Sequence, residues 1–177
     1  MDGNFPILKT ERLLLRRFSD TDLPKVFEGL SHPEVIRYYG VSFDSPEATK
    51  EQMKWFAGIE REGTGIWWAV CSKDNRIFYG AGGLNCIGKH RKAEIGFWLL
   101  PAFWGKGIMK EAVPLIVDYG FSKLHLHRIE GLVESDNQNC KNAMSKLDFQ
   151  HEGTMRDCEV KNGKFISLEI YARLNKV

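Results

Sequence analysis

Apolar residues recur at two spacings along this chain, and the change from one spacing to the other predicts where strands and helices lie. The run from Thr10 to Phe18 predicts a first strand. Ser19 offers a capping-box start to a helix whose apolar residues lie three and four apart between Leu23 and Leu30. A second helix is predicted from Ser45 to about Arg61, because serine is a favoured N-cap and the proline after it suits the first helical position.

Three extended runs occupy the middle of the chain, at residues 66–73, 77–87 and 93–100. Turn-forming residues separate them, so they predict an antiparallel meander. A third helix is predicted from Ile108 to about Gly120, where the apolar spacing becomes helical again. Pro114 lies inside this helix, where a proline removes one hydrogen bond and is expected to kink the helix.

The C-terminal part of the chain predicts a strand, a short helix and a hairpin. The strand is His127 to Glu134, and Asn137 is a natural cap for the helix that follows. The runs 150–160 and 164–174 flank an Asn-Gly pair, the strongest short hairpin signal. This order favours an α+β (mixed α/β) fold, with a mostly antiparallel central sheet of about seven strands and about four helices. No linker or repeat interrupts it, so we expect a single domain over residues 1–177.

Composition narrows the function classes. The 177 residues include 25 basic and 23 acidic side chains, a formal net charge of +2, which gives no electrostatic case for nucleic acid as a partner. Four cysteines without CxxC spacing favour reduced thiols over disulfides or a zinc site. His125 and His127 would share a strand face, but no third ligand accompanies them, so no metal is expected.

Hydropathy gives no sign of a membrane partner. No stretch approaches the roughly 18 apolar residues of a membrane span, and Met1 to Thr10 lacks the apolar core of a signal peptide. We therefore expect a cytoplasmic protein.

A glycine turn between a strand and a helix is the most informative segment. It lies in Ala93 to Met109, where Gly105-Lys106-Gly107 follows the third extended run and precedes the third helix. The first N–H groups of a helix have no internal partner and lie at the positive end of its dipole, so they can bind a phosphate. Such a turn is a weak signal alone, because glycine turns often precede helices as architecture. The chain has no Walker-type loop, and its Gly80 to Gly83 run is strand-like, which argues against ATP or NAD.

Two longer segments carry a resemblance to a known family. The run EIGFWLLPAFWGKGIMKEA resembles the acetyl-CoA signature of the GNAT superfamily of N-acetyltransferases, and NQNCKNAMSKLDFQHEG resembles the helix and strand that follow it. The likeness is nearest to the branch that acetylates the N-terminal alanine or serine of ribosomal proteins, and it spans nearly the whole chain. It implies acetyl-CoA as acetyl donor and splayed strands at the cofactor site.

The resemblance also implies which residues bind the cofactor. Main-chain amides in the glycine turn would bind the pyrophosphate, and main-chain groups of Phe97 and Leu99 would pair with pantetheine. Trp104 and Met109 stand where the family often has an arginine or glutamine and a small residue, but the contacts there are mostly main-chain. The full implied set is Phe97, Trp98, Leu99, Trp104, Gly105, Lys106, Gly107, Ile108, Met109 and Asn137.

Moving an acetyl group from a thioester to an amine requires a neutral amine, a polarised carbonyl and a proton for the leaving thiolate. Glu94 is the candidate base, directly or through water, and the alternative is a surface or ion-paired glutamate. Strand alternation would put Glu94 and Gly96 on one side, facing the acceptor cleft.

Asn137 and Cys140 are the other catalytic candidates. Asn137 is either an N-cap, a contact for the pantetheine arm or acceptor, or both. Cys140 occupies the position where the family branch usually has a serine thought to protonate the thiolate, and a thiol with a pKa near ~8.5 can also donate a proton. Plain helix packing is an alternative for Cys140. A covalent acetyl-cysteine is disfavoured, because no histidine partner accompanies it.

Three hypotheses follow for the whole chain. The favoured one is an N-acetyltransferase that works by direct attack of the amine, and the others are an inactive coenzyme A-binding module and an interaction domain. The acceptor is a protein N-terminus or a small molecule, with Tyr38 and Tyr39 as possible neighbours of its pocket. The state of assembly is a monomer or a homodimer.

Overall fold

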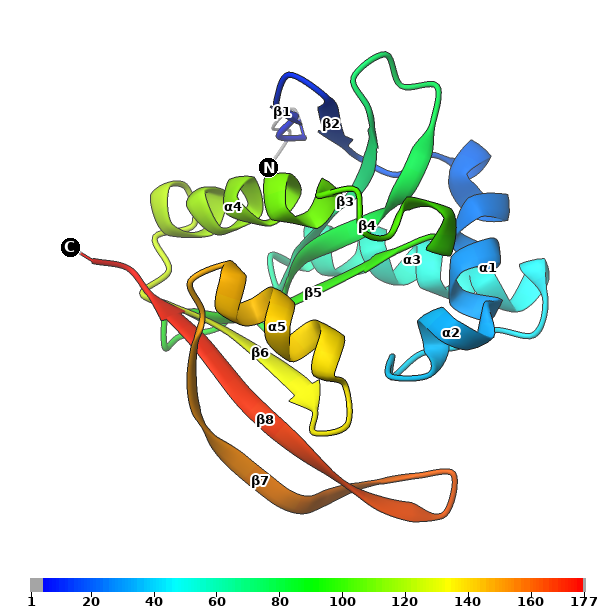
Figure 1. Cartoon of the computed structure of the whole chain (residues 1–177). Helices are drawn as coiled ribbons and strands as arrows, with labels where there is room; N and C mark the ends of the chain where they lie inside the picture. Colours follow the sequence, from blue (N-terminus) through cyan, green and yellow to red (C-terminus); the bar gives the residue numbers. More distant parts are fainter. Residues whose placement is uncertain (1–4, 177) are drawn as a thin grey trace.

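A computed structural model of the chain describes residues 5–176, so the first four residues of the segment considered for a signal peptide lie outside it. The described residues form one eight-stranded sheet, with strand order β1-β2-β3-β4-β5-β6-β8-β7, and five α-helices around it (Figure 1). The strands are β1 (Leu8–Lys9), β2 (Leu13–Arg16), β3 (Ile66–Ser72), β4 (Phe78–Asn85), β5 (Lys92–Leu99), β6 (Arg128–Glu134), β7 (Gln150–Lys161) and β8 (Lys164–Leu174). The helices are α1 (Leu23–Ser31), α2 (Pro33–Ile36), α3 (Pro46–Glu62), α4 (Ile108–Ser122) and α5 (Gln138–Lys146), with short 3-10 turns η1 (Asp20–Asp22) and η2 (Pro101–Phe103).

The mixed, mostly antiparallel sheet confirms the predicted fold class, and the element counts differ from the prediction in two places. The strand expected over residues 10–18 is shortened to β2, because the Thr10 hydroxyl accepts hydrogen bonds from the N–H groups of Arg12 and Leu13 and turns the chain there, and the two-residue strand β1 before this turn was not predicted. The unpredicted helix α2 has four residues and is capped by His32, so it is too short to show a helical period.

The longer elements begin and end where their local signals predict. Ser45 accepts a hydrogen bond from Ala48 N–H and caps α3, and Gly63 ends that helix with a φ of 69°. The β7–β8 hairpin turns at Asn162 and Gly163, whose φ values of 52° and 74° are those of a type I′ turn. The helix α4 is continuous through Pro114.

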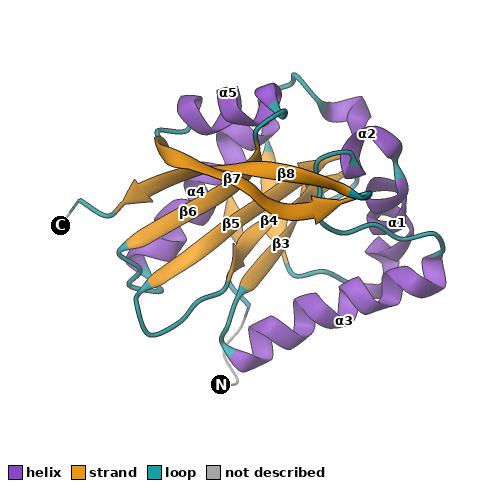
Figure 2. Cartoon of the chain, turned by 90° about the horizontal axis from the view of Figure 1, so that it is seen from below, coloured by secondary structure: helices purple, strands orange, loops and turns teal. Residues whose placement is uncertain are grey.

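Helices cover both faces of the sheet (Figure 2). On one face α4 and α5 enclose a core that includes Trp68, Ile116 and Ile129, all fully buried. On the other face α1 and α3 pack against β3, β4 and β5 through residues such as Leu30 and Trp98. This second core contains no residue of β6, β7 or β8, so the two ends of the sheet are covered differently.

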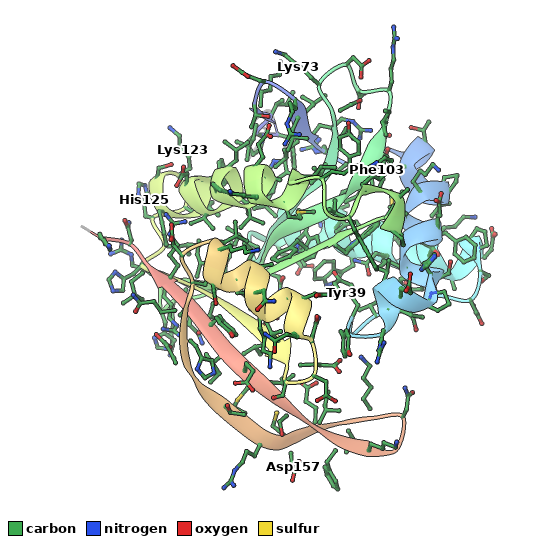
Figure 3. The ribbon with its side chains drawn as sticks, in the orientation of Figure 1. Tyr39, Lys73, Phe103, Lys123, His125 and Asp157 are labelled. Carbon is green, nitrogen blue, oxygen red and sulfur yellow. The ribbon has the colours of Figure 1, made fainter. Side chains whose placement is uncertain are left out.

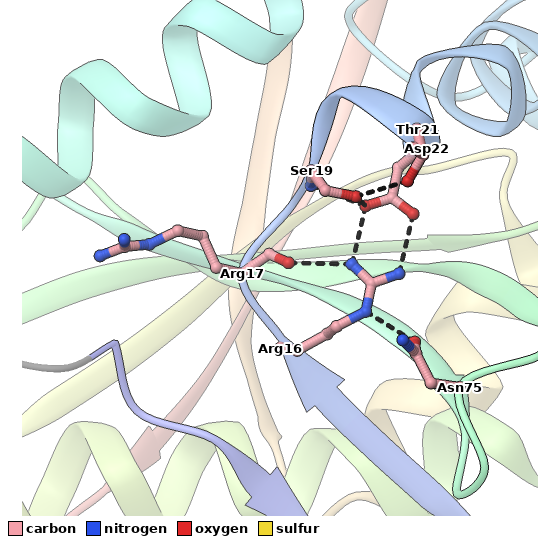
Figure 4. A network of polar contacts seen from close by, with 6 residues as sticks. All are labelled: Arg16, Arg17, Ser19, Thr21, Asp22 and Asn75. Atoms are coloured by element: carbon pink, nitrogen blue, oxygen red, sulfur yellow. Dashed lines mark hydrogen bonds and ion pairs between the residues drawn. The ribbon is translucent and has the colours of Figure 1, made fainter.

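An ion pair between the half-buried Arg16 and the buried Asp22 lies near the N-terminal edge of the sheet (Figure 4). Arg16 of β2 donates to both carboxylate oxygens of Asp22 at 2.7 and 2.8 Å, and its Nε donates to Asn75 at 2.7 Å. Burial alone would raise the pKa of Asp22, but hydrogen bonds from Arg16 and Ser19 hold that pKa below its usual value. The pair therefore connects β2, η1 and the β3–β4 turn.

The sheet opens in its middle, between β5 and β6. These two strands run parallel but pair only where Lys92, Ala93 and Glu94 meet residues 128–130. Beyond Glu94, β5 continues along β4 while β6 continues along β8. Within residues 5–176, the segment from Ile95 to Leu99 therefore has no ladder partner on its β6 side, which confirms the predicted splay.

Candidate active site

The glycine turn offers unpaired main-chain donors at the start of α4. Pro101 ends β5 because it has no N–H group, and after η2 the chain turns through Gly105 and Gly107 with φ values of 73° and 74°. Such φ values favour glycine. Within the described part of the chain, no acceptor bonds the N–H groups of Gly105, Lys106 or Gly107. A Cβ built on Gly105 would meet no atom within 4 Å, so an anion can approach this backbone closely.

The residues around the turn anchor it. Ile108 is buried in the core under α4 and Met109 packs against the same core, while the Lys106 ammonium lies 5.4 Å from the centre of the Phe103 ring. The Trp104 indole N–H donates to the Leu99 carbonyl at 2.9 Å. One acceptor position of that carbonyl is therefore already occupied.

The open edge of β5 presents main-chain groups of alternate residues. Leu100 N–H bonds to Tyr79 on the β4 side, and because successive residues of a strand point their main-chain groups to opposite edges, Phe97 and Leu99 direct theirs toward the gap. Trp98 directs its main-chain groups to β4 and packs its side chain against Gly29 of α1. Trp98 therefore directs no main-chain hydrogen-bonding group toward the gap.

Two carboxylates lie side by side where the strands diverge. Glu94 of β5 is the ladder partner of Glu130 of β6, in the last pair before the splay. Glu130 bonds to Lys92 at 2.8 Å and to Arg128 at 2.6 Å. Burial raises the pKa of Glu130, but these two cations hold that pKa below its usual value, so Glu130 stays charged at neutral pH.

Glu94 has the opposite electrostatic environment. Its pKa is raised, first by burial and then by the negative charges of Glu130 and Glu159, against a smaller opposing effect of Lys92. A carboxylate with a raised pKa is a stronger proton acceptor than an ordinary glutamate. The predicted strand alternation also holds, since Ala93 and Ile95 enter the core under α4 while Glu94 faces the other side.

Of the two tyrosines considered for the acceptor pocket, Tyr39 is the one near Glu94. Tyr39 follows α2 (Figure 3), and its pKa is raised by burial first and by the charge of Glu94 second. Tyr38 instead lies under the guanidinium of Arg37, 5.1 Å from its carbon to the ring centre. The segment after α2 thus faces the carboxylates at the splay through one tyrosine.

Asn137 and Cys140 lie at the start of α5. The Asn137 side chain accepts a hydrogen bond from Cys140 N–H at 3.1 Å, which confirms its role as N-cap. Cys140 is half-buried and packs against the core under α4. Burial raises the pKa of its thiol to about 11, well above the value that the sequence led us to expect. The thiol is therefore protonated at neutral pH, which suits a proton donor better than a nucleophile.

Residues 5–176 contain neither a metal-ligand cluster nor a disulfide. No group of three His, Cys, Asp or Glu side chains could hold a metal ion there, and the four cysteines are free thiols. No helix in that range has the length and apolar character needed to cross a bilayer.

Sequence reasoning missed Glu130 and Glu159, because their approach to Glu94 depends on strand register that no local signal gives.

Comparisons with known proteins agree with this architecture. A family model described as "Acetyltransferase (GNAT) domain" matches residues 12–150. The chain is 36% identical over 170 residues to the uncharacterized N-acetyltransferase YoaA of Bacillus subtilis (strain 168), over 95% of this chain and 96% of that protein. It is 33% identical over 76 residues to spermidine N(1)-acetyltransferase of Escherichia coli (strain K12), over 43% of this chain and 41% of that protein. A structure of RimL, a ribosomal alpha-N-protein acetyltransferase in complex with coenzyme A, shares the fold with a TM-score of 0.85 at 21% identity, over 96% of this chain and 98% of that one.

Proposed function

The chain belongs to the GNAT family of acetyltransferases, and on that premise we propose that it transfers the acetyl group of acetyl-CoA to a primary amine by direct attack of the amine. One observation carries the proposal. The unpaired edge of β5 runs from Glu94, whose pKa is raised, toward main-chain amides that have no partner within the described residues. Acetyl-CoA matches this edge in chemistry: its thioester suits the end near Glu94, its diphosphate suits the free amides, and its long polar arm suits the strand between them.

The residues around the splay fit acetyl-CoA. The free amides of Gly105, Lys106 and Gly107, with the first turn of α4 behind them, would hold the diphosphate. The main-chain groups of Phe97 and Leu99 would pair with the pantetheine amides, as an added strand does. When bound, acetyl-CoA supplies an activated acyl thioester. Asn137, already the cap of α5, lies across the gap on the segment after β6.

Proton transfers are assigned to two side chains. Glu94 takes a proton from the acceptor ammonium, directly or through a water, and its raised pKa suits that task. Cys140 donates a proton to the departing thiolate. Because burial raises its pKa to about 11, the transfer is uphill by roughly 3 kcal/mol relative to a thiol of ordinary pKa. The close approach of the Cys140 thiol to the departing thiolate would have to offset this free-energy difference.

The acceptor is a cation before it reacts, and the charges near Glu94 favour its approach. Glu159 adds negative charge beside Glu94, which attracts an ammonium group, whereas the charge of Glu130 is balanced by Lys92 and Arg128. A protein N-terminus and a small polyamine both carry such a group, and relatives named for each kind of acceptor resemble this chain. A cytoplasmic location and a monomeric or homodimeric state stay predictions from the sequence.

The decisive experiment measures thiol release from acetyl-CoA with a panel of N-terminal peptides, amino acids and polyamines. We expect turnover with at least one class and loss of about 100-fold in kcat/KM for Glu94→Gln, with an unchanged melting profile. Glu51→Gln is the matched control, because this glutamate is exposed on α3 and its ion pair is with the exposed Lys54. Calorimetric binding of acetyl-CoA without turnover on any acceptor would favour an inactive coenzyme A-binding module. Absence of binding would overturn both.

A further inference from the structure

An arginine from the other end of the chain lies beside the glycine turn. Arg12 precedes β2, yet a Cβ built on Gly107 would lie 3.8 Å from its Nη2 atom. The Arg12 side chain is 57% exposed, so solvent and ligands can reach it. The start of α4 therefore has a side-chain cation next to its free main-chain donors.

A carboxylate from the first turn of α4 holds this arginine in place. Glu111 accepts from Arg12 Nε at 2.8 Å and lies 2.5 Å from Nη2. The hydroxyl of Thr10 donates to the same carboxylate. Burial would raise the pKa of Glu111, but the hydrogen bonds from Thr10 and Arg12 lower it below its usual value, so the pair is ionised. Within residues 5–176 the Nη1 atom donates no hydrogen bond, so its two N–H groups stay available.

The chemistry of coenzyme A indicates which ligand group the Nη1 donors of Arg12 would bind. The main-chain amides of the turn would bind the diphosphate, but the nucleotide carries a separate 3′-phosphate for which those amides provide no donor. A planar guanidinium matches a phosphate through parallel hydrogen bonds. We propose that Arg12, oriented by Glu111, binds the 3′-phosphate of the cofactor and makes the protein prefer coenzyme A over 3′-dephospho-coenzyme A. The inference rests on the proposed function and adds a residue that selects which form of the cofactor binds.

Titration calorimetry with the two cofactors tests the inference without any turnover. We expect wild-type protein to bind coenzyme A about tenfold more tightly than its 3′-dephospho form, and this preference to shrink at high ionic strength. Arg12→Gln should remove most of the preference while leaving the affinity for 3′-dephospho-coenzyme A unchanged. Arg17→Gln is the matched control, because Arg17 is 56% exposed and pairs with the carboxylate of Glu60, as Arg12 pairs with that of Glu111. It should keep the preference.

A second variant separates phosphate binding from a purely structural ion pair. Glu111→Gln removes the carboxylate that orients Arg12 but leaves the guanidinium, so the preference for the 3′-phosphate should weaken and still exceed that of Arg12→Gln. Equal loss of affinity for both cofactors in Arg12→Gln and Glu111→Gln would show that the pair only supports the turn, and would overturn the inference. A preference unchanged in Arg12→Gln would overturn it as well. Failure of wild-type protein to bind either cofactor is a different result, because it removes the proposed function itself.

Discussion

The chemistry proposed for this protein depends on a contrast between two adjacent glutamates. Glu130 is stabilised as an anion by Lys92 and Arg128, whereas Glu94 has burial and negative neighbours around it. Strand alternation in the sequence predicts which side Glu94 faces. It does not predict Glu130, because the parallel register between β5 and β6 is set by tertiary packing.

The contrast predicts a pH dependence. As pH falls through the raised pKa of Glu94, the base becomes protonated, so kcat/KM should fall on the acidic side at a pH above the ordinary glutamate value of about 4.3. Glu130→Gln removes one negative charge beside Glu94 and should move this acidic limb to lower pH. The measurement is kcat/KM against pH for both proteins. An acidic limb that does not move would contradict the coupling, and Glu51→Gln should leave the profile unchanged.

Cys140 permits a second test at the same scale. If the thiol donates a proton, Cys140→Ser should keep most of kcat, because a hydroxyl at that position can also donate. Cys140→Ala should lower kcat by roughly 100-fold. Loss of all activity in the serine variant would instead indicate a nucleophile. Single-turnover kinetics of the two variants, with Cys86→Ser as an exposed control, provide the measurement.

At the scale of elements, local signals predict most boundaries. Ser45, Asn137 and the Asn162-Gly163 pair each mark an end that the structure confirms. The elements that escaped prediction, β1 and α2, have two and four residues, which is too short for any periodicity to appear. The strand β1 pairs only with the neighbouring β2, through Leu8 with Leu15 and Lys9 with Leu14, so its two residues carry no pattern of their own.

The helix α4 runs through a proline, and this has a measurable cost. Pro114 cannot donate a hydrogen bond to the preceding turn, so Pro114→Ala should raise the free energy of unfolding by about 1–3 kcal/mol. Pro46→Ala is the control, since Pro46 occupies the first position of α3 where no donor is needed. That change should stay within about 1 kcal/mol of wild type. Urea unfolding measures the free energy of both variants, provided that its dependence on urea concentration has the same slope as in wild type. A Pro114→Ala variant less stable than wild type would contradict the expectation.

At the scale of the whole molecule, one sheet with a shared core beneath α4 predicts one cooperative unit. Residues of β2, β3, β6 and β8 all contribute to that core. Calorimetric unfolding should therefore show a single transition, and the sequence-based expectation of one domain would be wrong if two transitions appeared. Acetyl-CoA at about 100 times its Kd should add about 2.7 kcal/mol to stability. The sequence pattern predicts the sheet, while the splay came from family resemblance, because divergence of two strands leaves no periodic signal.

Within the described chain three ladder pairs join β5 to β6, together with the ion pair of Lys92 and Glu130. The core under α4 spans this joint, but the core under α1 and α3 stops at β5. The joint is therefore supported by a core on one face only, and a cofactor arm hydrogen-bonded along β5 would add support beside it. Hydrogen exchange of β6 amides should slow when acetyl-CoA binds, and equal rates with and without it would mean that binding does not stabilise the joint. In that sense the donor substrate would complete the sheet on which it reacts.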